Sequence, residues 1–208
     1  MSKERNLELL AMDHGALEAL TLLWQRTHGL VQDGDPGPKT RRSIRTVAGA
    51  YNGEPGPLAV VVLEVARSEL GNGEIGGDNL GPCVAKYQGV DDTGKPLGSW
   101  CAGFVGWCIE EACSDLGMVC PVQRISWARS LFSRVRRAGM SVDKPIPGDI
   151  VLFERGDPGG SSHIGIVEDL TLETLHTIEG NVGRPPAKVK RCRHHLSSDR
   201  ILGFARLP

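Results

Sequence analysis

A cysteine, a histidine and a carboxylate occur in three separate segments that suit thiol chemistry. Cys101 opens a run, residues 101–112, whose apolar spacing is typical of an amphipathic helix. A helix N-terminus and a neighbouring histidine lower the pKa of a thiol, and the free N–H groups of the first turn can hold an oxyanion. His163 opens one predicted strand and Glu179 closes the next. These residues therefore predict a nucleophile, a general base and a group that orients the imidazole.

Glu179 and Asn181 are alternative partners for the imidazole. Alternation along a strand puts both on one face, so either side chain can reach the ring. His163 shares a face of its own strand with Gly165, which leaves room for the approaching helix. Each residue also has an ordinary structural interpretation, because a cysteine often packs as a small hydrophobic group, and a carboxylate near a turn is usually solvated. The spacing alone is weakly specific, since a cysteine and a histidine far apart in sequence often occur together by chance.

The elements that must position these residues follow a proline- and glycine-rich joint at residues 52–57. Before the joint, leucines at helical spacing predict a helix, residues 33–38 predict a sharp turn, and helical spacing resumes at residues 39–47. We therefore expect a small all-α module over residues 1–52 and a second domain over residues 57–208.

The second domain begins with predicted helices and ends with predicted strands. Residues 58–70 form an expected helix, and Ser126 is expected to cap another, in which Trp127 faces inward and Gly139 ends the helix. Beyond Pro147 the hydrophobic period shortens, which predicts strands at residues 149–154, 163–168, 174–179 and 201–206. Helices followed by an antiparallel sheet make an α+β fold.

Composition and charge exclude several classes of protein. Apolar residues make up 40% of the chain and charged residues 24%, which excludes wholesale disorder. The net charge of −1 argues against a dedicated nucleic-acid binder, and no run approaches the roughly 18 apolar residues of a membrane span. The first residues are charged and lead into no apolar segment, so we expect no signal peptide and synthesis and storage in the cytoplasm.

The six cysteines do not form a recognisable metal or disulfide pattern. A reducing compartment argues against disulfides, and no pair has the C-x-x-C spacing. Cys192 lies near His194 and His195, but in a spacing unlike structural zinc sites. We expect most of the cysteines to be buried as small hydrophobic residues, and we expect no cofactor.

Four segments in this order resemble the CHAP amidase group of papain-like enzymes, relatives of the NlpC/P60 peptidases. They are residues 100–107 (WCAGFVGW), 147–153 (PGDIVLF), 163–167 (HIGIV) and 178–181 (IEGN). The resemblance covers about residues 58–207, and the four segments together are quite specific. It implies a papain-like catalytic domain whose helices pack on an antiparallel sheet. Members of this group cleave amide bonds in the peptide part of bacterial cell walls.

The resemblance also implies roles for individual residues. Cys101 would be the nucleophile, His163 the general base and Glu179 the group that orients the imidazole, with Asn181 as a polar partner nearby. Asp149 matches the family's proline-glycine-aspartate turn and would be structural.

A glycine-rich loop over residues 69–87 is expected to flank the cleft, because glycines allow close approach of the backbone to a ligand. The expected substrate contacts are Trp100, Glu69, Asp78 and Tyr87; a plain surface loop is the alternative. Some relatives hold calcium with acidic residues upstream of the cysteine. Only Asp91 and Asp92 stand there, so we expect no metal.

The first module resembles the short helical peptidoglycan-binding module often attached to wall hydrolases. The resemblance rests on Trp24, Gln25, Gly29, Leu30 and the run at residues 33–44. Pro36 stands where that family usually has an aromatic or apolar residue, and a helical cap without ligand is the alternative. Two basic stretches, at residues 124–137 and 188–193, are expected to be a solvated helix face and tail.

These observations predict a monomeric hydrolase whose partner is bacterial peptidoglycan, with no nucleic acid and no membrane insertion. We expect the protein to cleave an amide bond of peptidoglycan, as an endopeptidase or an N-acetylmuramoyl-L-alanine amidase, by a Cys-His-Glu thiol mechanism. A wall hydrolase without a signal peptide fits a phage or prophage endolysin, held in the host cytoplasm until its release to the wall. The alternatives are an interbacterial amidase toxin, and a non-catalytic wall-binding or tail structural protein of the same fold.

Overall fold

The computed structural model describes residues 14–27, 29–35, 37, 40, 55–89, 93–156 and 161–208. The chain divides into two compact units, residues 1–45 and 46–208, which are described separately. Half of the expected joint at residues 52–57, and all but residue 40 of the expected helix at residues 39–47, lie outside the described residues. Among the helices that are described, none has the length and apolar character needed to span a membrane.

A single glutamine organises the described part of the first unit. Helix α2 (His14–Thr27) carries Gln25, which is only 1% exposed. Its amide nitrogen donates to Oδ1 of Asp33 at 2.7 Å and to Oγ1 of Thr40 at 3.0 Å, while its amide oxygen accepts from the N–H of Gly34 at 3.0 Å. Gly34 has φ +72°, which favours glycine. The turn after α2 is therefore tied to the helix through one buried side chain.

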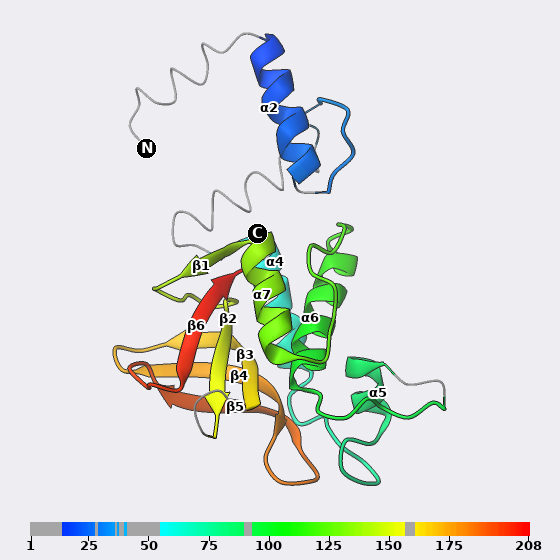
Figure 1. Cartoon of the computed structure of the whole chain (residues 1–208), viewed down its shortest axis with the longest axis vertical. Helices are drawn as coiled ribbons and strands as arrows, with labels where there is room; N and C mark the ends of the chain where they lie inside the picture. The colour runs from blue at the N-terminus through cyan, green and yellow to red at the C-terminus, as the bar shows by residue number, and fades with distance from the viewer. Residues whose placement is uncertain are drawn as a thin grey trace. The chain divides into compact units, whose positions relative to one another are not determined.

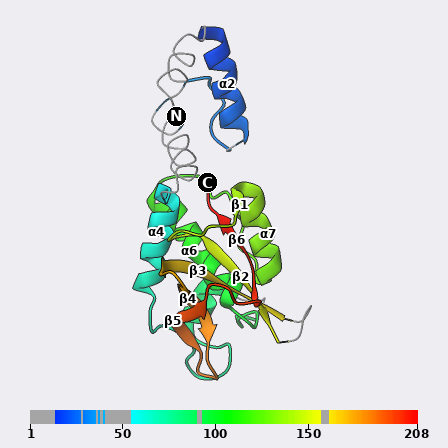
Figure 2. The same ribbon diagram turned by 90° about the vertical axis from the view of Figure 1, so that its left-hand side faces the viewer.

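The second unit has the predicted order of helices first and antiparallel sheet second (Figures 1 and 2). The helices are α4 (Pro57–Ser68), α5 (Pro82–Gln88), α6 (Cys101–Asp115) and α7 (Ala128–Ala138). The strands are β1 (Met140–Val142), β2 (Ile150–Arg155), β3 (Ser161–Leu170), β4 (Thr174–Val182), β5 (Lys188–His195) and β6 (Ile201–Arg206). They form one antiparallel sheet in the order β1-β6-β2-β3-β4-β5. The α+β fold class is confirmed.

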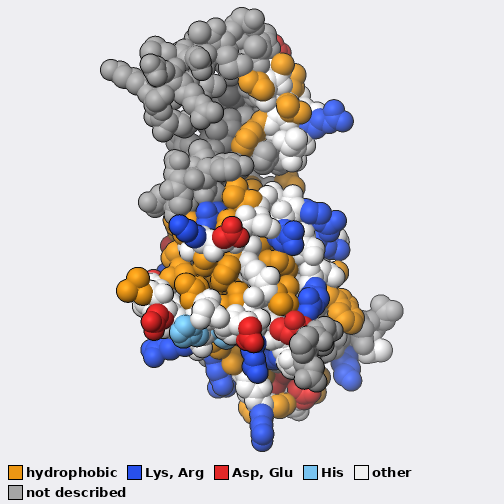
Figure 3. Space-filling view, turned by 60° about the vertical axis from the view of Figure 1, so that its left-hand side comes forward, with side chains coloured by type: hydrophobic (Ala, Val, Ile, Leu, Met, Phe, Trp, Pro, Cys, Tyr) orange, Lys and Arg blue, Asp and Glu red, His pale blue; other side chains and the backbone are white. Residues whose placement is uncertain are grey.

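The main core lies between the sheet and the helices α4, α6 and α7, which stand on one side of it (Figure 1). Helix α6 is at the centre of this core, and its residues are buried nearly all round rather than on the single face expected. A smaller cluster, Val151, Phe153, Val167 and Leu175, comes from alternate positions of β2, β3 and β4. Over the second unit, Figure 3 shows charged side chains of both signs interspersed, in line with a net charge near zero.

Glycines let α6 approach the sheet, but at a different position from the one expected. A Cβ on Gly180 of β4 would lie 2.7 Å from Cβ of Phe104, so this glycine makes room for the helix. A Cβ on Gly165 of β3 would instead lie 2.7 Å from Cγ of Glu179. Gly165 therefore makes room for a side chain from the next strand, and the expectation that it faces the helix is wrong.

Three other sequence-based expectations need correction. Trp127, not Ser126, is the N-cap of α7, and its side chain is 75% exposed instead of facing inward. The basic stretch at residues 188–193 belongs to β5 and is no tail. The glycine-rich loop contains α5, and its first part runs along the sheet edge, where Gly73 bridges to Lys188 and Glu74 N–H donates to the carbonyl of Ala187.

A buried ion pair holds the turn into β2 against the last strand. Asp149 is completely buried, and its two carboxylate oxygens accept from Nε and Nη2 of Arg206, each at 2.9 Å. Oδ2 also accepts the N–H of Ile146 at 2.8 Å. The placement agrees with the structural role expected for Asp149.

We predict that Asp149→Ala lowers the free energy of unfolding of the second unit by about 3–5 kcal/mol, because it leaves the Arg206 guanidinium buried without its partner. Urea unfolding followed by tryptophan fluorescence measures the change. The matched control is Arg129→Ala, which removes a pair with Glu154 whose Arg129 side chain is 48% exposed, and which should cost less than about 1 kcal/mol. Equal losses in both variants would contradict the structural role of Asp149.

Candidate active site

Cys101 is the first residue of α6, and the residue before it is locked in place. Trp100 is the N-cap and is fully buried; its ring stacks on Tyr87 with centroids 5.4 Å apart. Cys101 itself is 5% exposed. The first N–H groups of a helix have no partner within the helix, so the thiol lies beside donors that suit an oxyanion.

Glu74 fixes Trp100 from the loop, and sequence reasoning missed it. Its Oε1 accepts from the indole N–H of Trp100 at 3.2 Å and from the backbone N–H of Asn79 at 2.9 Å. Its Oε2 accepts from the backbone N–H of Ala187 at 2.6 Å. One buried carboxylate thus connects the loop, the start of β5 and the residue next to Cys101. A glutamate among glycines gives no sequence signal of such a role.

His163 on β3 and Glu179 on β4 form a buried pair. Nε2 of His163 donates to Oε2 of Glu179 at 2.8 Å, and the two residues are 5% and 3% exposed. Gly165 provides the space for the Glu179 side chain. Burial alone would raise the pKa of Glu179, but hydrogen bonds from His163 and His194 outweigh it and hold that pKa well below its usual value. The carboxylate is therefore an anion that holds one nitrogen of the ring.

The second oxygen of Glu179 is also occupied, by residues that the sequence did not indicate. Oε1 accepts from Oγ1 of Thr177 at 2.5 Å and from Nε2 of His194 on β5 at 2.6 Å. The His194 ring lies 4.3 Å from that of Phe153. Recognising β5 as a strand would have been the signal, since its pairing with β4 puts His194 on the strand next to Glu179, where the two side chains meet.

The other ring nitrogen of His163 is left for the thiol. Nδ1 is buried and has no hydrogen-bond partner among the described residues that meets standard geometry. Burial lowers the pKa of His163, yet the contacts with Cys101 and Glu179 prevail and raise it to about 9. Burial raises the pKa of Cys101, yet His163 prevails and lowers it below the ordinary thiol value. The two groups therefore favour a thiolate and an imidazolium side by side.

Asn181 does not take the position beside the imidazole that alternation predicted. Its φ of +60° and the register shift between Glu179 and Val182 break the alternation of β4. Its side-chain amide donates to Oγ of Ser99 at 3.0 Å, and its carbonyl accepts from Arg155 at 3.4 Å. A hydrogen bond from Ser99 and the charge of Arg155 contribute, after His163, to the lowered pKa of Cys101. Of the two alternatives, Glu179 holds the ring and Asn181 lies on the rim.

The expected substrate contacts fall into two groups. Trp100 and Tyr87 are fully buried, and Glu69 is 8% exposed because it accepts from the hydroxyl of Tyr87 at 2.5 Å and from Lys86 at 2.8 Å. These three side chains pack the domain, which corrects the expectation that they form an open substrate surface. Asp78 is exposed, so a contact between Asp78 and substrate stays a prediction.

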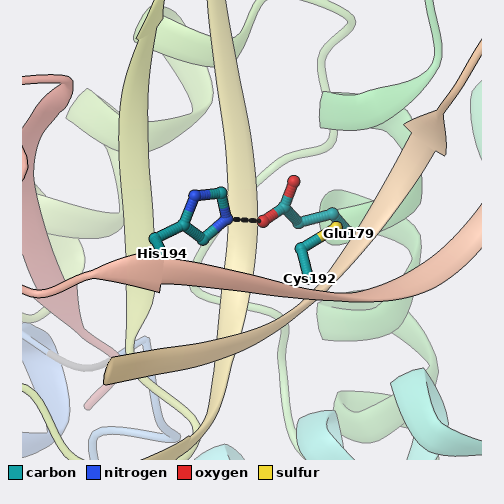
Figure 4. Close-up of side chains that lie close together, drawn as sticks. All are labelled: Glu179, Cys192 and His194. Atoms are coloured by element: carbon teal, nitrogen blue, oxygen red, sulfur yellow. Dashed lines mark hydrogen bonds and ion pairs between the residues drawn. The ribbon is translucent and has the colours of Figure 1, made fainter. Parts of the chain in front are cut away.

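The sequence predicted no metal site. Asp91 and Asp92, the acidic residues upstream of Cys101, lie outside the described residues. Within the part of the chain that is described, one group of side chains has the composition and spacing for a metal: Glu179, Cys192 and His194 (Figure 4). Burial raises the pKa of Cys192 to about 12, and the charge of Glu179 adds to this effect. Cys192 is therefore a neutral thiol beside the carboxylate.

We predict that iodoacetamide modifies Cys101 at mildly acidic pH, because His163 keeps the thiol ionised below its usual pKa. His163→Ala should slow the labelling below about pH 8 by about tenfold or more, because it removes the imidazolium, whose pKa is raised to about 9. Peptide mass spectrometry resolves Cys101 from Cys120, whose pKa a hydrogen bond from Cys113 lowers to about 7. Cys120 should label equally in both proteins, and an unchanged rate at Cys101 would argue against the pair.

We also predict that Glu179→Gln weakens the proton affinity of His163 by about tenfold or more, because it removes the negative charge from the carboxylate. The pKa of His163 in the fold is raised to about 9, so its protonation adds to the free energy of unfolding. This contribution is complete below the pKa of the unfolded chain and is lost as the pH rises through about 9. Ring resonances followed by NMR titration measure the shift. Glu154→Gln, which alters a carboxylate paired with Arg129, is the control and should leave His163 unchanged.

A family model matches the part of the chain that carries this arrangement. Residues 90–181, which include Cys101, His163 and Glu179, match the model of the CHAP domain. Similar solved structures include Ly7917, with 17% identity, a TM-score of 0.47 and coverage of 72% of this chain and 62% of that one. Another is a protein described as similar to lipoprotein, NLP/P60 family, from Staphylococcus aureus subsp. aureus Mu50, with 16% identity, a TM-score of 0.39 and coverage of 94% and 62%.

The chain thus spans 62% of the length of each of these two structures. No curated protein matches it. The matched range contains all four segments that carry the sequence resemblance, and it begins before the segment leading to Cys101. Over residues 90–181 this chain is therefore similar to CHAP domains, a family of peptidoglycan amidases and peptidases.

Proposed function

We propose that this protein hydrolyses an amide bond of a peptidoglycan peptide through a thioester on Cys101. The observation that carries the proposal is that the two ring nitrogens of His163 have different surroundings. Nε2 lies 2.8 Å from Oε2 of Glu179, whereas Nδ1 is buried and has no hydrogen-bond partner among the described residues. A base held in this way has one nitrogen left to exchange a proton with the thiol. A buried cysteine that served only in packing would not need such a histidine.

In the proposed reaction, the Cys101 thiolate attacks the carbonyl carbon of the scissile amide. The oxyanion that forms lies near the first N–H groups of α6. His163 then protonates the leaving amine, and the thioester forms as the C–N bond breaks. Water, activated by the same imidazole, hydrolyses the thioester and restores the thiol. Glu179 stays ionised throughout and stabilises the imidazolium.

Ser99, Asn181 and Arg155 lie on the rim of this site, and they offer polar contacts to the peptide. Arg155 is exposed and Asn181 half-buried, so both are accessible to a large substrate. The family supports a peptidoglycan substrate. An endopeptidase and an N-acetylmuramoyl-L-alanine amidase release fragments with different new termini, which mass spectrometry distinguishes.

We further propose that the protein acts as an endolysin of a phage or prophage, stored in the cytoplasm of the host until it reaches the wall. The first unit supports this proposal through its resemblance to a wall-binding module. In the described part of that module, Gln25 ties the turn at residues 33–35 to α2. An interbacterial toxin with the same catalytic domain is the alternative.

Clearing of purified sacculi, followed as turbidity, tests the hydrolase. We expect the wild-type protein to clear them, and Cys101→Ser to lose at least about a thousandfold in rate while keeping the same melting temperature. Mass spectrometry of the released fragments identifies the new termini and hence the bond. Equal clearing by both proteins would exclude the thiol mechanism. Sedimentation of the wild-type protein with sacculi, without clearing, would favour a non-catalytic wall-binding protein.

A further inference from the structure

Three potential metal-ligand atoms of different elements lie close together around Glu179, the carboxylate that binds His163. A carboxylate oxygen of Glu179, Sγ of Cys192 and a ring nitrogen of His194 all lie within 4.8 Å of one another, a grouping that stands alone among the described residues (Figure 4). We propose that these residues bind a thiophilic divalent cation, with Zn²⁺ as the preferred ion. The site lies entirely on β4 and β5.

The sheet brings these groups together and holds them. Cys192 and His194 are alternate residues of β5, so their side chains project from the same face. Cys192 is opposite Thr177 in the register, which puts Glu179 diagonally across from it on β4. Because the ligands come from two hydrogen-bonded strands, little backbone order is lost when a metal binds.

The donor set matches zinc in type and in size. Zinc in proteins favours tetrahedral sites built from cysteine sulfur, histidine nitrogen and carboxylate oxygen, with bonds of about 2.0–2.3 Å. Such a tetrahedron separates its ligand atoms by about 3.3–3.8 Å. Nε2 of His194 and Oε1 of Glu179 are now 2.6 Å apart, so they must open by about an ångström to admit the ion. Calcium and magnesium, which prefer oxygen ligands, fit this set poorly.

The site also has a route of entry and a balanced reaction. The His194 side chain is 29% exposed and Cys192 is half-buried, so an ion can enter beside the imidazole. Binding releases the thiol proton of Cys192 and breaks the hydrogen bond between His194 and Glu179, while the His194 proton moves from Nε2 to Nδ1 so that Nε2 can bind the ion. Glu179, which is already ionised, contributes its charge, and water completes the fourth position.

This site shares its carboxylate with the catalytic pair, which gives it a consequence under the proposed function. Oε2 of Glu179 accepts from His163 while Oε1 faces the proposed metal. A dication on Oε1 offsets the negative charge that stabilises the His163 imidazolium, and it places two positive groups on one carboxylate. The occupied site is therefore inhibitory.

Cobalt binding tests the site without any need for turnover. The measurement uses the whole chain with the substitution Cys101→Ser, so that the thiol of Cys101 cannot bind the metal. We expect one Co²⁺ per chain with near-ultraviolet absorption from a thiolate–cobalt bond, lost on addition of one equivalent of Zn²⁺. A further Cys192→Ser change should abolish the absorption, and His194→Ala should weaken Co²⁺ binding at least tenfold.

The matched controls are Cys120→Ser and His195→Ala in the same background, because these residues are a half-buried cysteine and an exposed histidine outside the group. Both should bind Co²⁺ like the parent. Absence of the thiolate absorption, or its persistence after Cys192→Ser, would overturn the site.

Turnover of the wild-type protein tests the inhibition. Zn²⁺ should slow the clearing of sacculi, a chelator should restore it, and Cys192→Ser should resist Zn²⁺ when each rate is compared with its own metal-free value. Inhibition that persists in Cys192→Ser would assign the effect to the catalytic thiol and overturn the inhibitory role. A chain that binds cobalt but never clears sacculi would overturn the hydrolase and leave the metal site standing.

Discussion

The arrangement at the site depends on one buried anion, the carboxylate of Glu179. A carboxylate that is 3% exposed survives as an anion only if donors surround it, and His163, His194 and Thr177 supply them. Those donors come from three strands, so the charge is satisfied only when β3, β4 and β5 are paired in this register. The position of the imidazole therefore depends on the pairing of all three strands and not only on His163 and Glu179.

The helix that carries Cys101 is fixed by a second buried carboxylate. Glu74 binds the indole of Trp100 and the backbone of Ala187, while Trp100 packs on Tyr87 and Glu69 binds the Tyr87 hydroxyl. Thus the thiol and the imidazole are positioned by separate networks that meet where α6 packs on Gly180 of β4. Three of the four residues expected to touch substrate, Trp100, Tyr87 and Glu69, belong to this supporting network instead.

Strong local patterns made the main elements predictable from the sequence. The helix at Cys101, the strands that carry His163 and Glu179, and the α+β order all follow from hydrophobic spacing and turn residues. The strand β5 was missed because its exposed positions hold lysine and arginine, which give the sequence the look of a solvated tail. Its pairing with β4 is a long-range contact that no local pattern encodes. The same strand brings in His194 and Cys192, so those neighbours of Glu179 were missed together.

Details of side-chain placement failed where the backbone departs from regular geometry. Alternation predicted that Asn181 and Glu179 share a face, but a left-handed residue and a register shift turn Asn181 toward Ser99. Gly165 and Gly180 were indistinguishable in sequence, since only the packed structure tells which neighbour needs the space.

The segment at residues 71–74 runs along the outer side of β5 through the bridge of Gly73 to Lys188 and the bonds of Gly71, Asn72 and Glu74 to residues 187 and 189. An uncovered outermost strand exposes unpaired N–H and C=O groups, which readily recruit a strand from another molecule. This short segment occupies those groups at residues 187–189 and so keeps the beginning of β5 from pairing with a strand of another molecule. A Cβ on Gly73 would lie 2.2 Å from the carbonyl oxygen of Ala187, so any larger residue there would displace the segment and uncover the beginning of β5.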